Sequence, residues 1–282
     1  MPLKDRRIAF VGAGNMGGAL LSGILKADLV PSEQVTASTP EKEQLAALAQ
    51  KHPGLVTTAN NKEAVGSADI VVIAVKPQII EKVLSEISGV VPRDALVLSV
   101  AAGVPIDFIH ALVHRRVARA MPNTPAVVGM GATAVAFSEE CDERDVEAVK
   151  AIFEAVGLVT VIDESLIDAV TGLSGSGPAF IFTIIEALAD AGVKVGLPRR
   201  QAQSLAAQTV AGSARLLLES GEHPGVLKDQ VTSPGGTAIA GLHTLEQGGL
   251  RTTLINAVQA ATERARELGR QQAGHAASKD DD

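Results

Sequence analysis

The first part of the chain alternates short apolar runs with stretches in which apolar residues recur every three to four positions. The first pattern is typical of strands and the second of amphipathic helices. The run Ile70–Val75 is apolar on both faces, as in a central strand covered on either side. This alternation predicts a parallel sheet with crossover helices. The predicted strands are Ile8–Val11, Val35–Ala37, Ile70–Val75, Leu96–Val100, Val117–Ala120 and Val159–Ile162, with Ala132–Phe137 as an antiparallel addition at the edge.

After Asp163 the strand pattern disappears, and helical patterns are interrupted by Gly and Pro at 172–178, 192–198, 221–224, 233–236 and 248–249. The stretches Phe180–Ala189 and Ser204–Leu218 carry more apolar surface than one thin layer can cover. This favours burial against a partner chain over a monomeric compact bundle. We therefore predict an α/β Rossmann-type doubly wound sheet in residues 1–164 and an all-helical dimerisation domain in residues 165–270. The polar residues 271–282 are predicted to be a disordered tail.

Composition narrows the function. The chain has 282 residues, a net charge of −7, 2% aromatic residues, and neither Trp nor Tyr, which argues against nucleic acid or an anionic membrane as partner. Cys141 is the only cysteine, so neither an intrachain disulfide nor a thiolate metal cluster is expected. The N-terminus lacks a signal-peptide pattern, which predicts a cytoplasmic protein. Two uncharged stretches, 120–138 and 169–185, are interrupted by Gly and Pro, so no membrane helix is expected.

The segment Gly12-Ala13-Gly14-Asn15-Met16-Gly17 lies between a predicted strand and a predicted helix. By itself this glycine spacing fits an ordinary tight turn equally well. In this context it indicates dinucleotide binding, with Gly12 for the turn, Gly14 for the approach of the pyrophosphate and Gly17 for helix packing.

Residues 36–39 at the end of the second strand are Thr, Ala, Ser and Thr, where an NAD-selective domain places a carboxylate on the ribose. Ser38 and Thr39 can donate hydrogen bonds to a 2′-phosphate, which favours NADPH with NADH also accepted. Alternatively, these hydroxyls cap a helix starting near Pro40.

Three further strand ends carry candidate residues. Lys76 follows the strand ending at Val75 and could reach a cofactor phosphate, although a lone lysine is more often a solvated loop residue. Val100–Gly103 offers small residues against which a nicotinamide ring could lie. Arg119–Pro125 supplies an amide and a hydroxyl near the expected reaction centre, and buried turn chemistry would explain that segment equally well.

The segment Val231–Leu242 suggests a substrate site. Its Ser-Pro-Gly-Gly turn precedes a predicted helix, and two glycines allow backbone N–H groups to converge on a carboxylate without a charged side chain.

Together these segments resemble the pyrroline-5-carboxylate reductase family from Ile8 to about Leu268. The specific stretches are Ala74–Pro77, Arg119–Pro125, Gly172–Phe180 and Leu227–Gly236. The resemblance implies NAD(P)H-dependent reduction of the cyclic imine 1-pyrroline-5-carboxylate to L-proline by a homodimer or larger homo-oligomer. It implies that the substrate is held by the partner's helical domain, at Ser233, Pro234, Gly235, Gly236, Thr237 and Ala238. It places the cofactor on Gly12, Ala13, Gly14, Asn15, Met16, Gly17, Ser38, Thr39, Asn61, Val75, Lys76, Pro77, Ala101 and Ala102.

One departure from the family concerns the residues after the paired glycines, where many relatives carry two threonines and this chain has Thr237-Ala238. Thr237, Ser233 or an ordered water could make the contact with the ring nitrogen, and the first two are the catalytic candidates. The rival enzyme class, the β-hydroxyacid dehydrogenases, needs a lysine in the helix after Gly177, where Pro178–Ile185 has none. A non-catalytic nucleotide sensor would not need the Ser233–Gly236 turn. No His, Asp or Glu stands in the glycine-rich segments as a general acid, and the six histidines are expected to be surface or capping groups.

Overall fold

The computed structural model describes the backbone of residues 2–277 and the side chains of residues 2–270. The chain divides into two compact units. Unit 1 comprises the residues up to Ser176 and the chain from Ala260 onward, and unit 2 comprises Gly177–Gln259. The contacts thus assign the chain from Ala260 onward to the first unit. The domain limits at 164 and 270 stay predictions.

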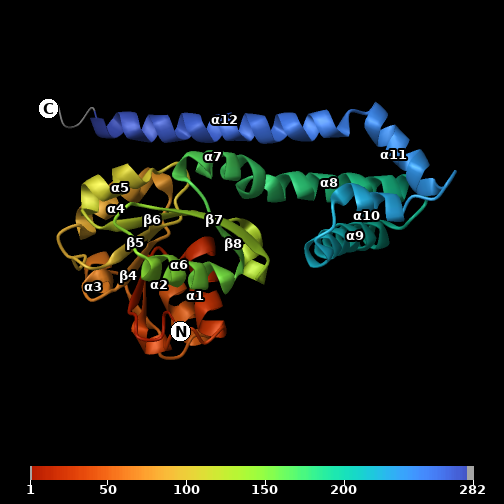
Figure 1. Cartoon of the computed structure of the whole chain (residues 1–282). Coiled ribbons are helices and arrows are strands. Elements are labelled where there is room, and N and C mark those ends of the chain that lie inside the picture. Colours follow the sequence, from red (N-terminus) through yellow and green to blue (C-terminus); the bar gives the residue numbers. More distant parts are fainter. Residues whose placement is uncertain (1, 278–282) are drawn as a thin grey trace. The chain divides into compact units, whose positions relative to one another are not determined.

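Unit 1 contains an eight-stranded sheet of order β3-β2-β1-β4-β5-β6-β7-β8 (Figure 1). The first six strands are parallel, β7 runs antiparallel to β6, and β8 is parallel to β7. The predicted doubly wound α/β sheet is confirmed. The strands are β1 Ile8–Val11, β2 Val35–Ser38, β3 Val56–Thr58, β4 Ile70–Ile73, β5 Leu96–Ser99, β6 Arg116–Met121, β7 Gly131–Phe137 and β8 Gly157–Val161.

Alternate side chains of each central strand enter two cores. Ile8 and Phe10 belong to the core under α1, α2 and α6, while Ala9 and Val11 belong to the core under α3, α4 and α5. Both faces of the sheet are therefore covered by helices (Figure 1), as the doubly apolar strands require. The helical elements of this part are α1 Asn15–Lys26, η1 Ser32–Gln34, α2 Lys42–Lys51, α3 Asn61–Val65, α4 Pro77–Ile87, α5 Ile106–Val113, η2 Thr124–Val128, α6 Glu143–Glu154, η3 Glu164–Leu166 and α7 Ile167–Val170.

The sheet differs from the sequence prediction in two respects: one strand was missed, and the edge position predicted for Ala132–Phe137 is wrong. Strand β3 was not expected, because its three residues, Val56–Thr58, are too short and too exposed to show a pattern. Strand β7 is antiparallel as predicted but does not form the edge, because β8 pairs with its outer side. Leu158 and Val161 of this edge strand are exposed.

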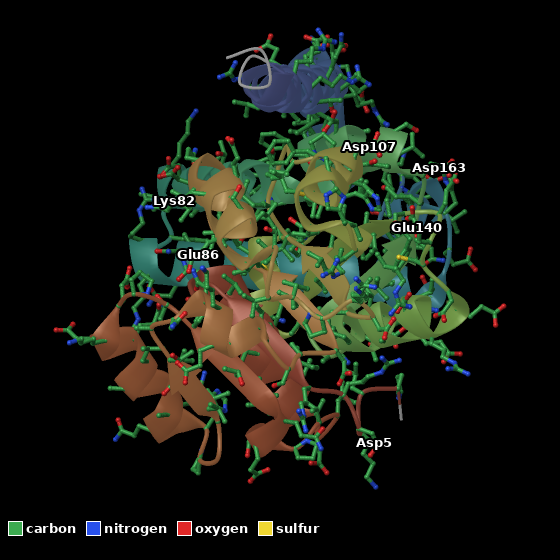
Figure 2. The ribbon with its side chains drawn as sticks, turned by 90° about the vertical axis from the view of Figure 1, so that its left-hand side faces the viewer. Asp5, Lys82, Glu86, Asp107, Glu140 and Asp163 are labelled. Carbon is green, nitrogen blue, oxygen red and sulfur yellow. The ribbon has the colours of Figure 1, made fainter. Side chains whose placement is uncertain are left out.

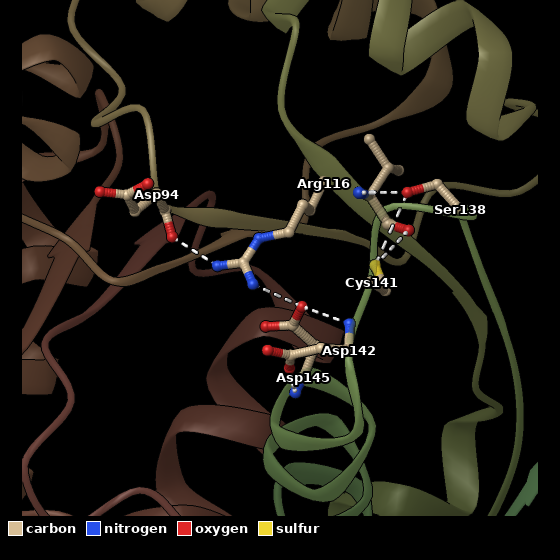
Figure 3. A network of polar contacts seen from close by, with 7 residues as sticks. Asp94, Arg116, Ser138, Cys141, Asp142 and Asp145 are labelled. Atoms are coloured by element: carbon tan, nitrogen blue, oxygen red, sulfur yellow. Dashed lines mark hydrogen bonds and ion pairs between the residues drawn. The ribbon is translucent and has the colours of Figure 1, made fainter.

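A polar network fixes the edge of the sheet where β6 begins and β7 ends (Figure 3). Arg116 Nη1 donates to Asp145 Oδ2 at 2.8 Å, and Arg116 Nη2 donates to the Asp94 carbonyl at 2.6 Å. Asp142 and Asp145 form a reciprocal capping box at the start of α6. Cys141 Sγ donates to the Val117 carbonyl at 3.4 Å, and burial raises the pKa of this thiol. This network lies at the edge opposite the strand ends that carry the candidate site.

The sequence predicted that the glycine-rich segment 172–178 interrupts the helical pattern, and this prediction is wrong. Thr171–Gly175 instead form a π-helical turn, η4, between α7 and the next helix, α8 (Gly177–Lys194). A Cβ on Gly175 would meet Met121 Cε at 2.5 Å, so the small residue there allows close packing.

Unit 2 is entirely helical. Helices α8 and α9 pack against each other, yet Phe182, Leu205 and Leu218 are 64%, 58% and 70% exposed. The stretch Glu164–Lys194 has the length and hydropathy of a membrane-crossing helix. Exposed apolar residues of α8 such as Phe182 lie in the stretch Phe180–Ala189, which the sequence analysis predicts to pack against a partner chain. Its helices are α8 Gly177–Lys194, α9 Arg199–Ser220, α10 Pro224–Gln230 and α11 Thr237–Gln247. Helix α12, Leu250–Ala277, begins in unit 2, and from Ala260 onward it belongs to unit 1.

Helix α12 extends further than predicted. It continues through Ala277, so the disordered tail expected from Gln271 is wrong for residues 271–277. Residues 278–282 lie outside the described residues.

Candidate functional site

The glycine loop between β1 and α1 has the geometry that nucleotide binding requires. Gly12 has φ +91°, and a Cβ on it would stand 2.7 Å from the Ala74 carbonyl oxygen. A Cβ on Gly17 would collide with the Gly12 carbonyl oxygen and stand 3.0 Å from Ala74 Cβ. Both glycines are therefore needed for the turn and for the packing of α1 on the sheet.

Gly14 serves a different purpose. A Cβ there would meet nothing within 4 Å, so packing within the protein does not demand glycine at this position. Gly14 is the N-cap of α1, with φ −62° and ψ −164°, and has no side chain to accept from the first turn. The N–H groups of residues 15–17 have no acceptor within the helix and carry the positive end of its dipole. This open cradle fits the pyrophosphate of a dinucleotide.

The end of β2 differs from the sequence expectation. Ser38 is fully buried, and its hydroxyl donates to Asn61 Oδ1 at 2.8 Å. Its single proton is thus used within the protein, and a contact with a 2′-phosphate stays a prediction. Thr39 is 6% exposed, and its Oγ1 accepts from the Glu41 N–H at 3.4 Å. The helix expected near Pro40 begins at Lys42 with Glu41 as N-cap, so neither hydroxyl is the N-cap.

In the sheet, β4 lies next to β1, and β5 is the next strand after β4. Lys76 is an exposed N-cap of α4, and Pro77 occupies the first helical position. Beyond β5, the buried Ala101 donates its N–H to Ser99 Oγ at 3.2 Å, while Ala102 is exposed. The structure therefore gathers the cofactor residues named by the sequence at the carboxyl edge of β1, β2, β4 and β5, where ligands bind in such sheets.

The end of β6 is committed mainly to internal contacts. Arg119 is 6% exposed and forms a salt bridge with Glu164 at 2.9 Å. Asn123 accepts from the Ala132 N–H at 2.9 Å and donates to the Ser174 carbonyl at 3.0 Å, which ties the π-helical turn to the sheet. Buried turn chemistry therefore explains the Asn123 amide, while Thr124 remains exposed.

The Ser233–Gly236 turn lies in unit 2. Gly235 has φ +69°, and the Gly236 N–H donates to the Ser233 carbonyl at 3.0 Å. Gly236 is the N-cap of α11, and Thr237 is the first helical residue. The alternative in which Thr237 caps a helix starting near Ile239 is therefore wrong. The exposed turn presents the first N–H groups of α11 together with the Ser233 and Thr237 hydroxyls, a set of donors suited to a carboxylate.

Two histidines outside these segments have structural partners. His223 accepts from the Gly225 N–H at 3.1 Å as the N-cap of α10, so the capping expectation is confirmed for this histidine. His52 Nε2 lies 2.9 Å from Ser22 Oγ, and burial followed by the neighbouring Lys51 charge lowers the pKa of the imidazole. No group of three or more His, Cys, Asp or Glu placed to hold a metal occurs among the described residues.

The sequence analysis did not identify Glu86, which contacts one of the predicted cofactor residues. Asn61 Nδ2 donates to Glu86 Oε2, with 3.3 Å between the two atoms. Glu86 lies in the last turn of α4, far along the chain from both Ser38 and Asn61, and no local pattern marks it.

Two family models match separate parts of the chain. A family model described as pyrroline-5-carboxylate reductase dimerisation matches residues 164–268, and one described as NADP oxidoreductase coenzyme F420-dependent matches residues 7–103. The match with the dimerisation model begins one residue before the domain limit expected at 165.

Individual relatives align over nearly the full length. A pyrroline-5-carboxylate reductase from Methanosarcina acetivorans is 46% identical over 95% of this chain and 100% of its own. The solved structure of a reductase of the same name from Coxiella burnetii has a TM-score of 0.89 and 38% identity over 93% of this chain and 98% of its own. The Plasmodium falciparum pyrroline carboxylate reductase with NADP bound has a TM-score of 0.83 and 34% identity over 94% and 99%. The chain belongs to the pyrroline-5-carboxylate reductase family.

Proposed function

We propose that this protein reduces 1-pyrroline-5-carboxylate to L-proline with NADPH, and that it also accepts NADH. The observation that carries the proposal is the near full-length match to a reductase of this name at 46% identity. The open Gly14 cradle and the intact Ser233–Gly236 turn support it independently, because the reaction needs one site for a dinucleotide and another for a carboxylate.

The chain's own residues would hold the cofactor at the carboxyl edge of the sheet. The free N–H groups at the start of α1 bind the pyrophosphate, and Asn61 and Thr39 stand at the strand end where the ribose is recognised. Lys76, which follows β4, is an exposed cation at the same edge of the sheet. The remaining proposed contacts are Gly12, Ala13, Asn15, Met16, Gly17, Ser38, Val75, Pro77, Ala101 and Ala102.

A bound nicotinamide nucleotide supplies a hydride for transfer to the imine carbon. The protein's task is then orientation, because a protonated C=N bond is already an electrophile. The N–H groups of Thr237 and Ala238 bind the substrate carboxylate, with Pro234, Gly235 and Gly236 shaping the turn. Thr237 or Ser233 donates or accepts at the ring nitrogen. No acid or base in residues 233–238 competes for the proton that this nitrogen retains.

The helices of unit 2 support a proposal about the oligomeric state. The match to a dimerisation model and the exposed apolar side chains of α8 and α9 support a homodimer or larger homo-oligomer, in which the partner supplies the substrate turn. We further propose that the protein is cytoplasmic, because reduction by NADPH uses a soluble cofactor and a small polar substrate.

The test is oxidation of NADPH that depends on the imine, measured with the five-membered and six-membered ring carboxylates and with proline identified as product. Cofactor binding without turnover would overturn the proposal and favour a nucleotide sensor. Binding of proline to the complex with NADP⁺, measured by isothermal titration, separates the cases further, because a sensor without a carboxylate site should bind none.

A further inference from the structure

Three polar side chains form a chain of hydrogen bonds across the cofactor edge of the sheet. Ser38 Oγ donates to Asn61 Oδ1 at 2.8 Å, and Asn61 Nδ2 donates to Glu86 Oε2 at 3.3 Å. The three residues come from the end of β2, the first residue of α3 and the last turn of α4. Figure 2 shows Glu86 on α4 with Lys82 one turn earlier, and no described residue forms a salt bridge with Glu86.

Glu86 decides which way the Asn61 amide faces. A hydroxyl such as that of Ser38 can donate or accept, so it tolerates either amide orientation. An ionised carboxylate only accepts, so it requires the NH₂ group of Asn61 on its side. The amide oxygen is thereby turned to Ser38. The second Nδ2 hydrogen of Asn61 has no partner among the described residues and can be donated to a ligand.

The charge of Glu86 also matters at this position. Ser38 ends the second strand, where a dinucleotide fold reads the ribose 2′ substituent. Residues 36–39 contain no carboxylate, and Glu86 brings a negative charge to the same cluster through Asn61. That charge opposes a 2′-phosphate and leaves a 2′-hydroxyl unaffected.

We propose that Glu86 is a positioning residue that sets cofactor preference, because its carboxylate orients the Asn61 amide toward the ribose and its charge limits the advantage of NADPH over NADH. This inference rests on the proposed function.

The test is isothermal titration of NADP⁺ and NAD⁺ into the wild type, Glu86→Gln, Glu86→Leu and the control Glu81→Gln. The control removes the same charge from the same helix. Glu86→Gln should tighten NADP⁺ binding about 3- to 10-fold, the size expected for removing one exposed like charge near a phosphate, while the NAD⁺ Kd changes less than twofold. The gain should shrink in 1 M salt. Glu86→Leu, which also removes the acceptor, should weaken NAD⁺ binding about 3- to 10-fold, the loss of one modest hydrogen bond.

Steady-state kinetics should show the same shift in the ratio of kcat/KM values for NADPH and NADH. A ratio within twofold of wild type in Glu86→Gln, or an equal shift in Glu81→Gln, would overturn the inference while wild-type imine reduction leaves the proposed function standing. A wild type that binds neither nucleotide would remove both.

Discussion

Gly14→Ala should separate ligand binding from folding in the dinucleotide loop. The added methyl group meets no atom within 4 Å, and Gly14 already has an extended backbone with φ −62° that alanine readily adopts. The folding cost is limited to a poorer N-cap, about 0.5–1 kcal/mol. For a chain of this size that corresponds to a fall in Tm of about 1–4 °C.

The same methyl group should obstruct the cofactor. It would project into the open space at the start of α1, where the phosphate oxygens approach the free N–H groups. Loss of one hydrogen bond to a charged group is worth about 1.5–3 kcal/mol, which raises the Kd for NADPH about 10- to 100-fold. Isothermal titration gives the Kd, and scanning calorimetry gives the Tm of the same sample.

Gly17→Ala is the matched control. Its Cβ would collide with the backbone oxygen of Gly12, which cannot move aside as a flexible side chain would. Overpacking of this kind costs about 1–3 kcal/mol, so Gly17→Ala should melt well below Gly14→Ala. A wild-type Kd in Gly14→Ala, or equal melting of the two variants, would refute the assignment of separate roles to these glycines.

Three further predictions concern other parts of the chain. Gly236 and not Thr237 is the N-cap of α11, so Thr237→Val should keep the wild-type Tm within about 2 °C while kcat/KM falls about 10- to 100-fold. Ala238→Thr should leave kcat/KM unchanged or raise it slightly. Unchanged kinetics in Thr237→Val would rule out a contact between Thr237 and the substrate. Asp145→Asn should lower the free energy of unfolding by about 2–3 kcal/mol in urea titrations, because the Asp145 carboxylate is 4% exposed and neutralises Arg116; the exposed Asp107→Asn should change it by less than about 0.5 kcal/mol, and equal effects would contradict the role of the network. The pKa of Asp142 is lowered chiefly by the hydrogen bond from the Asp145 N–H, so the stabilisation by this carboxylate is present above the unfolded pKa and is lost as pH falls below about 4. Asp142→Asn keeps the cap and should make the free energy of unfolding fall less steeply with acid. An unchanged dependence on pH would show that Asp142 does not contribute to the acid sensitivity.

Local patterns were sufficient for most of the sheet and for the glycine loop. Runs such as Ile70–Ile73 are buried on both faces, so every residue of the strand carries the signal. The roles predicted for Gly12 and Gly17 hold because both depend on atoms close in the chain or on the neighbouring strand end at Ala74. Strand β3 has no comparable hydrophobic pattern, because its three residues are partly exposed. It forms a strand because it pairs with β2, and this pairing is not visible in its own sequence.

The remaining differences arise from contacts between distant segments. Glycines at 172 and 175 predict a break, yet Met121 packs against Gly175 and Asn123 holds the Ser174 carbonyl, so the helix passes through a π turn. The Ser38 hydroxyl faces inward because Asn61 lies opposite it, and Asn61 is fixed by Glu86 from a separate helix. A single sequence does not contain these pairings in any short window.

The two ends of the sheet differ in how well they resist unwanted pairing. Strand β3 has only three residues and offers little backbone to a neighbouring chain. Strand β8, Gly157–Val161, has no charged residue, and its Leu158 and Val161 are exposed. Among the described residues, no strand pairs with its outer side. Uncharged edge strands of this kind are templates for intermolecular strand addition. We therefore expect aggregation on heating to begin at β8, and Leu158→Lys to reduce it.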